Sequence, residues 1–248
     1  MKWSMGGGGC FPTGRHYPGI AHLIRVAAVG VADEWPADLP MNELPLVCID
    51  TETTGRDPAL DRVVEIGCVF FFKAGVTERK SWLINPECPI PKEASDVHGI
   101  KDEDVASAPK FEEIASELTS ALVGHVPVAY NAEFDRDFLM AELGRVDLSL
   151  TTMPPAFRKG VEWLDPLTWA RELQKDAKSK ALGEVCERLG IELVRAHRAT
   201  DDAEAAVRVL AAFAGDIRVP KTYAAFLQEQ RRLGRIFEEE RVRWRGGN

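Results

Sequence analysis

Asp50 and Glu52 stand two residues apart at the end of an apolar run, in the segment LVCIDTETTG of residues 46–55. Residues 47–49 suit a strand covered on both faces, and the period of a strand directs both acidic side chains to one side. Adjacent carboxylates repel each other and are costly to bury, and a divalent cation with oxygen ligands is the usual compensation. A solvated strand end followed by a turn explains the same residues, so this pair alone leaves both interpretations open.

A second candidate lies in the segment AYNAEFD of residues 129–135, where Asn131 and Asp135 flank the change from a strand to a helix. Asp135 would lie in the first helical turn, where the helix dipole favours a carboxylate. A residue that only caps the helix also fits this position. The carboxyl end of a strand is nevertheless where open α/β sheets bind ligands, so a functional role for Asp135 stays open.

A third candidate is the segment HRATDD of residues 197–202, which precedes a helical pattern. If the helix begins at residues 200–202, Asp202 lies in its first turn and His197 lies in the preceding loop. The two side chains could then share one site. The alternative is a surface histidine followed by acidic residues that interact only with the helix dipole.

The order and spacing of these three motifs closely resemble the DEDDh family of 3′→5′ exonucleases, whose members share an RNase H-like fold. The resemblance covers about residues 44–214. The segment VHGI of residues 97–100, which follows PKEA at 91–94, is also similar to a segment of the proofreading epsilon subunits of bacterial DNA polymerase III. The resemblance implies an exonuclease domain of the α/β class, with a mixed five-stranded sheet flanked by helices.

The resemblance implies two bound metal ions, Mg²⁺ or Mn²⁺, held by the carboxylates of Asp50, Glu52, Asp135 and Asp202, with Asp50 bridging the ions. Hard oxygen ligands suit these metals and suit zinc poorly. Two ions about 3.5–4 Å apart activate a water molecule and stabilise the leaving 3′ oxygen. The acidic residues would therefore serve catalysis by holding the ions.

The resemblance also implies roles in proton transfer and substrate binding. His197 would be the general base, because imidazole exchanges a proton near neutral pH and a loop position lets it swing toward the substrate. Glu93 would hold the terminal 3′ hydroxyl and His98 would pack near the last base or sugar, although both also suit the surface of a proline-rich loop. The residues implied to contact substrate are Asp50, Glu52, Glu93, His98 and Asp202.

We therefore expect a metal-dependent exonuclease that hydrolyses phosphodiester bonds at a single-stranded or frayed 3′ end of DNA, in proofreading or repair. Its products would be nucleoside 5′-monophosphates. A ribonuclease of the same family, acting on RNA 3′ ends, is the alternative among enzymes. An inactive member that only binds nucleic acid or protein is the alternative from another class, and the presence of all five catalytic residues argues against it.

A sheet and its helices must bring these motifs together. After the first strand, β-branched, aromatic and apolar residues predict strands over 62–72, 77–84 and 126–130, and residues 161–164 are interpreted as a short fifth strand. Prolines between residues 86 and 91 predict a break in regular structure. Helical spacing predicts helices over 111–123, 134–143, 167–173, 181–189 and 199–213. Glu65 would support the cluster from the second strand, whereas Asp165 and Asp201 are interpreted as structural neighbours.

The composition indicates one folded α/β domain with extensions, since the 248 residues are 45% hydrophobic and 28% charged. The five cysteines are odd in number and include no Cys-x-x-Cys pair, which argues against a disulfide framework and a zinc cluster. The net charge of −8 excludes a protein that coats nucleic acid by bulk electrostatics, but not local binding supported by metal ions. We expect a cytoplasmic protein with no membrane association.

Residues 1–40 contain four consecutive glycines and no clear periodicity, which predicts a poorly ordered N-terminal extension. The apolar residues 20–32 are too few to span a bilayer, and Arg25 among them argues against a signal peptide. Met41, just before the first strand, is a second candidate for the start of translation.

Residues 216–248 are predicted to form an amphipathic helical extension beyond the family resemblance. Residues 223–244 carry an apolar stripe, and their opposite face is rich in arginine. A helix docked on the exonuclease domain explains the stripe. The alternatives are a helix that binds a polymerase or a second copy of the chain, or an arm that contacts nucleic acid.

Overall fold

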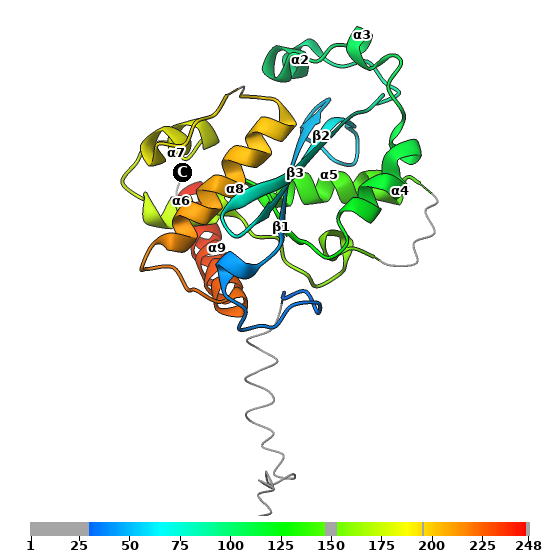
Figure 1. The fold of residues 1–248 in the computed structure, drawn as a ribbon. Coiled ribbons are helices and arrows are strands. Elements are labelled where there is room, and N and C mark those ends of the chain that lie inside the picture. Colours follow the sequence, from blue (N-terminus) through cyan, green and yellow to red (C-terminus); the bar gives the residue numbers. More distant parts are fainter. Residues whose placement is uncertain (1–29, 147–152, 195, 247–248) are drawn as a thin grey trace, which may run out of the picture.

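A mixed sheet lies at the centre of the computed structural model, which describes residues 30–146, 153–194 and 196–246 (Figure 1). Its strands are β1 (Leu46–Thr53), β2 (Val63–Phe72), β3 (Gly75–Leu83) and β4 (Val126–Val128). Within the described residues the sheet has four strands in the order β3-β2-β1-β4. β1 pairs antiparallel with β2 and parallel with β4, so β1 is central and every later element is placed around it.

Helices cover both faces of the sheet (Figure 1). They are α4 (Phe111–Ala121), α5 (Ala132–Gly144), α6 (Pro166–Leu173), α7 (Leu182–Leu189), α8 (Ala199–Gly215) and α9 (Tyr223–Gly246). Val47 and Ile49 of β1 share a core with α4 and α5, whereas Cys48 shares one with α6 to α9. Because strand residues alternate between faces, Asp50 and Glu52 lie on the side of α8.

The fifth strand predicted over residues 161–164 is not formed. Leu164 makes an isolated parallel bridge to Val128 of β4: its amide donates to the carbonyl of Pro127 at 2.9 Å and its carbonyl accepts from the amide of Ala129 at 3.1 Å. The neighbouring carbonyl of Trp163 and amide of Asp165 bond to the side chain of Gln230 on α9, each at 2.9 Å. The short apolar run therefore predicted the burial of this segment and its place beside β4, but the pairing is limited to one residue.

Two short helices follow β3, where the prolines predicted a break in regular structure. α2 covers Lys92–His98 and begins directly after Pro91, and α3 covers Asp102–Val105. A proline suits the start of a helix, because the first amides need no partner within the helix. Both helices lie beyond one end of the sheet in Figure 1. Single 3-10 turns, η1 and η2, cover Met41–Glu43 and Pro155–Phe157.

The first half of α9 is docked on the rest of the molecule. Phe226 is fully buried, and its ring lies 4.6 Å from that of Trp169 on α6. Residues 30–40, the described part of the predicted N-terminal extension, also pack here, and the amide of Ala32 donates to the hydroxyl of Tyr223 at 3.3 Å. Residues 1–29 lie outside the described residues, and the division of the chain into domains stays a prediction.

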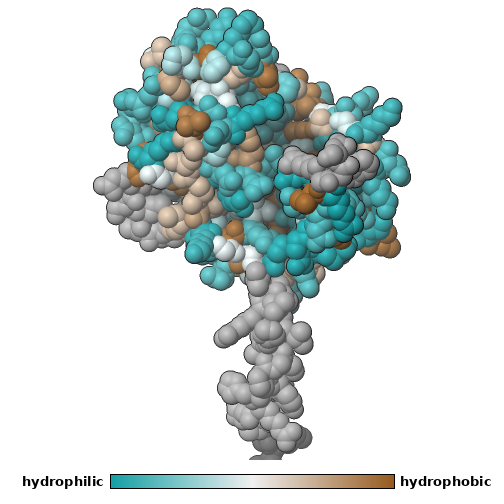
Figure 2. All heavy atoms as spheres, turned by 180° about the vertical axis from the view of Figure 1, so that it is seen from behind, coloured by the Kyte–Doolittle hydropathy of each residue, from teal (hydrophilic) through white to brown (hydrophobic). Residues whose placement is uncertain are grey.

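The face seen from behind is mostly hydrophilic, with hydrophobic residues among the hydrophilic ones (Figure 2). No helix in the described part of the chain is long and apolar enough to cross a lipid bilayer. The cysteines of the described residues are all free: Cys48, Cys68 and Cys186 are buried and Cys88 is exposed.

Candidate metal centre

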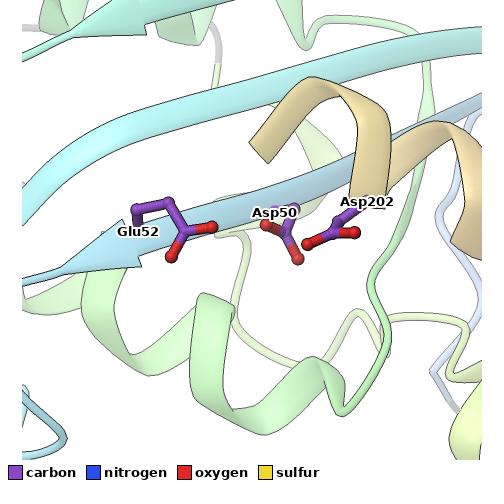
Figure 3. A group of neighbouring side chains, drawn as sticks. All are labelled: Asp50, Glu52 and Asp202. Carbon is purple, nitrogen blue, oxygen red and sulfur yellow. The ribbon is translucent and has the colours of Figure 1, made fainter. Parts of the chain in front are cut away.

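Three carboxylates meet above β1. Asp50 and Glu52 come from the strand and Asp202 comes from the first turn of α8, and one oxygen of each lies within 4.8 Å of the others. Figure 3 shows the three side chains directed toward a common space between the strand and the helix. The structure thus brings together residues that are far apart in the sequence but that the motifs predicted to share a site.

The close approach of α8 to the sheet depends on Gly67 of β2. Gly67 pairs with Asp50 across the two strands. A Cβ atom at Gly67 would lie 2.3 Å from the carbonyl carbon of Ala199 and 2.3 Å from the amide of Thr200. Glycine is therefore required where the first turn of α8 crosses β2, and this contact delivers Asp202 to the cluster.

The start of α8 is held by Glu65, which lies opposite Glu52 on β2. The Glu65 carboxylate is 1% exposed and accepts hydrogen bonds from Arg198 Nη2 at 2.7 Å and Nε at 3.2 Å. It also accepts one from the amide of Ala199 at 3.3 Å, where the helix dipole favours negative charge. Glu65 therefore fixes the start of the helix that carries Asp202, and the charge of Arg198 partly offsets the effect of the nearby carboxylates on Glu52.

His197 is tied to the cluster through its backbone. Its amide donates to Asp202 Oδ2 at 3.0 Å, its φ angle is +66°, and its side chain is exposed. A left-handed conformation is uncommon for histidine and costs energy, so the surrounding structure must hold it. The imidazole thus extends from a fixed point beside Asp202, which is compatible with the predicted loop position.

Asp135 lies beside this group rather than within it. From the first turn of α5 its Oδ1 accepts hydrogen bonds from the amide of Thr51 at 2.9 Å and from its hydroxyl at 2.8 Å. β4 pairs with β1 only as far as Cys48, so the amide of Thr51 has no strand partner on that edge and Asp135 supplies one. Thr51 separates Asp50 from Glu52, and Asp135 is therefore bonded to the backbone that carries both.

Burial raises the pKa of all four carboxylates, and repulsion within the group adds to the shifts of Asp50 and Glu52. Burial is the largest cause for Asp50, whose pKa is raised well above its ordinary value, and the charges of Asp135 and Asp202 follow. Burial and the charge of Asp202 raise the pKa of Glu52 to about 8. Burial raises the pKa of Asp135 to about 7, and it also raises the pKa of Asp202. Bound positive charge would relieve this repulsion, and these hard oxygen donors fit a divalent cation.

The two substrate residues predicted on the proline-rich segment differ in position. Glu93 is exposed in the first turn of α2. His98 is buried at the end of the same helix, where its Nδ1 accepts a hydrogen bond from the amide of Ile100 at 3.0 Å. Burial is the largest influence on the pKa of His98 and lowers it, whereas the interaction with the backbone of Thr53, at the end of β1, raises it. His98 thus lies near the strand that carries the cluster, and its role stays a prediction.

Sequence reasoning missed Gly67 and Gln230, and it treated Asp165 only as a neighbour. An isolated glycine inside a strand is a signal for close backbone approach, and Gly67 carried that signal. Asp165 before Pro166 is a typical helix start, and Asp165 indeed caps α6 by accepting from the amide of Leu167 at 2.8 Å. No local signal marks Gln230, because its burial depends on a distant segment.

Comparisons with known proteins agree with the motifs. A model of the exonuclease family, RNase T, matches residues 47–210. The chain is 32% identical over 211 residues to the PolC-type DNA polymerase III of Streptococcus mutans, a match that covers 82% of this chain and 14% of the relative. It is 38% identical over 161 residues to the DNA polymerase III subunit epsilon of Treponema pallidum, covering 62% of this chain and 69% of that protein.

Solved exonuclease structures share the fold. Exonuclease X in complex with 5′-overhanging duplex DNA has a TM-score of 0.56 and 24% identity, covering 73% of this chain and 98% of that one. The nuclease domain of 3′hExo, a DEDDh family member bound to rAMP, has a TM-score of 0.57 and 17% identity, covering 71% of this chain and 94% of that one. The predicted α/β exonuclease fold, RNase H-like, is therefore confirmed, with four strands instead of five.

Proposed function

This chain belongs to the exonuclease family, and from that membership we propose that it removes nucleotides from the 3′ end of DNA in a metal-dependent reaction. The observation that carries the proposal is the convergence of Asp50, Glu52 and Asp202 on one space. Phosphodiester hydrolysis needs stabilisation of developing negative charge, and clustered carboxylates hold the cations that provide it.

Asp50, Glu52, Asp135 and Asp202 would hold two Mg²⁺ or Mn²⁺ ions. Such ions, when bound, provide a nucleophilic water at neutral pH and positive charge at the scissile phosphate. The protein's own contribution is to fix the carboxylates before substrate arrives, through Gly67 beneath α8 and through the hydrogen bonds of Asp135 to Thr51. Preorganised ligands lose little freedom on binding, which supports a site built for ions rather than a chance gathering of acids.

His197 would accept the proton of the attacking water. Its amide is bonded to Asp202 and its side chain is exposed, so the imidazole would be accessible to a substrate bound at the cluster. Glu93 and His98 would contact the terminal nucleotide from α2, beyond the end of β1. Asp50, Glu52 and Asp202 would contact the substrate at the scissile phosphate.

DNA is the proposed substrate because the relatives are named as DNA polymerase III proteins and exonuclease X was solved with DNA. A single-stranded or frayed 3′ end would bring its last phosphate to the cluster. The same names support association with a polymerase, for which the exposed residues 238–243 of α9 are the candidate surface. Self-association through this helix and a cytoplasmic location stay predictions.

Digestion of 5′-labelled single-stranded DNA and RNA of equal sequence, with Mg²⁺ or Mn²⁺, tests the proposal. We expect a ladder that shortens from the 3′ end of DNA, release of nucleoside 5′-monophosphates, and no cleavage with EDTA. Asp202→Asn should abolish trimming, whereas Asp201→Asn, its neighbour outside the cluster, should retain it. Faster trimming of RNA would reassign the substrate, and no trimming of either would leave the inactive binding module as the better explanation.

A further inference from the structure

Gln230 on α9 lies outside the residues that match the exonuclease family, yet it bonds to the backbone next to the site. Its side chain is 8% exposed. Its Oε1 accepts from the amide of Asp165 at 2.9 Å, and its Nε2 donates to the carbonyl of Trp163 at 2.9 Å. Phe226 and Leu233, one turn to either side, are buried apolar residues. A buried amide in an apolar face is costly unless both of its ends are bonded, so Gln230 fixes the geometry of residues 163–165.

The segment that Gln230 holds in turn fixes the start of α5. Asp165 Oδ1 accepts hydrogen bonds from the amide of Asn131 at 3.0 Å and from the amide of Leu167 at 2.8 Å. Asn131 precedes α5 and has a φ of +69°, a conformation that needs support from its surroundings. The junction between β4 and α5 is therefore anchored to the carboxylate of Asp165.

The first turn of α5 carries Asp135, which completes the connection. Asp135 is 3% exposed and accepts two hydrogen bonds from Thr51, between Asp50 and Glu52. A continuous series of bonded groups thus runs from Gln230 through Asp165 and α5 to the strand that carries the cluster. Hydrogen bonds outside the ligands set ligand orientation, and their loss typically weakens metal binding.

We propose that Gln230 is a positioning residue that sets the place of Asp135 and so tunes the affinity of the site for its metal ions. The inference rests on the proposed function, because it assigns a ligand role to Asp135. It makes α9 part of the metal site rather than an appended helix. The exposed Gln228, on the same helix but without these bonds, has no such role.

The test compares Gln230→Met, which keeps the size of the side chain and loses both bonds, with Gln228→Met as the matched control. Free Mn²⁺ is measured by electron paramagnetic resonance in titrations without nucleic acid, together with trimming of single-stranded DNA and the melting temperature of the metal-free protein. We expect the Mn²⁺ dissociation constant of Gln230→Met to rise roughly 10-fold or more. Turnover at saturating Mn²⁺ should stay within about threefold of the wild type, since the ligands themselves are retained.

An unchanged Mn²⁺ dissociation constant in Gln230→Met, with or without a lower melting temperature, would overturn the inference and leave Gln230 as a stabilising residue only. Weaker binding in Gln228→Met to the same extent would overturn it as well. If Gln230→Met does not fold, Gln230→Glu, which retains one acceptor and the side-chain shape, is titrated in its place and must also bind Mn²⁺ more weakly. A wild type that binds no Mn²⁺ and trims nothing would instead refute the proposed function.

Discussion

The acidic side chains of the cluster repel one another, and the fold holds them together against that repulsion. Asp50 and Glu52 are fixed by the strand, and Asp202 by the first turn of α8. The raised pKa of Glu52, about 8, means that the folded metal-free protein retains protons that the unfolded chain releases above its ordinary pKa. The stability of the metal-free protein should therefore fall as the pH rises from about 4.5 through 8.

Asp50→Asn should remove the part of this pH dependence that comes from Asp50 itself, whose pKa is raised by burial and by the charges of Asp135 and Asp202, while the part that comes from Glu52 remains. At pH 8 the metal-free variant should melt several degrees above the wild type, because each kcal/mol corresponds to about 2–4 °C for a chain of this size. At pH 5 the two should melt at nearly the same temperature, since the wild-type carboxylates are then largely protonated. Calorimetry of both proteins in EDTA provides the measurement. A variant that melts many degrees lower at both pH values would mark Asp50 as a structural residue.

His197→Asn isolates the proposed proton transfer. Asparagine tolerates the φ of +66° and retains the backbone amide that bonds to Asp202, so the cluster should be undisturbed. Turnover should fall roughly 10²–10⁴-fold, while the Mn²⁺ dissociation constant stays within about threefold. Single-turnover trimming at saturating Mn²⁺ is the measurement. Near wild-type turnover would show that His197 only links the loop to α8.

At the scale of elements, the site depends on how tightly α8 lies on β2. The contact at Gly67 leaves no space for a Cβ atom, and Glu65 bonds the residues that begin the helix. A small displacement of α8 would move Asp202 while leaving Asp50 and Glu52 in place on the strand. The arrangement of the three acids is therefore more sensitive to this packing than the fold as a whole.

Gly67→Ala should displace the start of α8 and weaken both stability and metal binding. Overpacking of this kind costs about 1–3 kcal/mol. We expect the melting temperature to fall by roughly 2–12 °C at about 2–4 °C for each kcal/mol. The Mn²⁺ dissociation constant should rise as well. Gly183→Ala on α7 is the control, because its nearest neighbour to a new Cβ atom is a side-chain carbon at 3.8 Å. Equal Mn²⁺ affinity in Gly67→Ala and the wild type would show that the helix accommodates the methyl group.

The elements that the sequence could predict are those with a complete local pattern. The density of β-branched and aromatic residues correctly predicted the position of β2, and helical spacing correctly predicted the positions of α4 and α8. The prediction of a fifth strand over residues 161–164 was wrong, because a run of four residues does not show whether the segment pairs as a strand or is only buried. The glycine inside β2 signals a close backbone approach but not that α8 makes it, and no local signal marks Gln230, since both partners are distant in the sequence.

At the scale of the whole molecule, α9 joins the sheet-covering helices to the segment beside β4. Its first half is buried through Tyr223, Phe226, Leu227 and Leu233. Residues 238–243 are exposed and carry arginine–glutamate pairs such as Arg241 with Glu238 at 2.8 Å. The docking interpretation thus accounts for the apolar stripe as far as Phe237, which packs against the core.

Phe226→Ala should destabilise the protein without changing its oligomeric state. Truncation of a buried phenylalanine costs about 3–5 kcal/mol. This corresponds to a decrease of roughly 6–20 °C in melting temperature. Thermal unfolding and light scattering on the same sample measure the two quantities. A dimer that dissociates in the variant, with little change in melting temperature, would show that α9 also covers a second copy of the chain.

The three clustered acids lie at opposite ends of residues 47–210, the range that matches the exonuclease family. Asp50 and Glu52 lie near its start and Asp202 lies near its end. A ribosome translating this chain therefore releases β1 long before α8 has been made. A premature stop or a proteolytic cut between residues 52 and 202 leaves each fragment with at most two of the three clustered acids. The three acids therefore cannot come together until the first turn of α8 has been made.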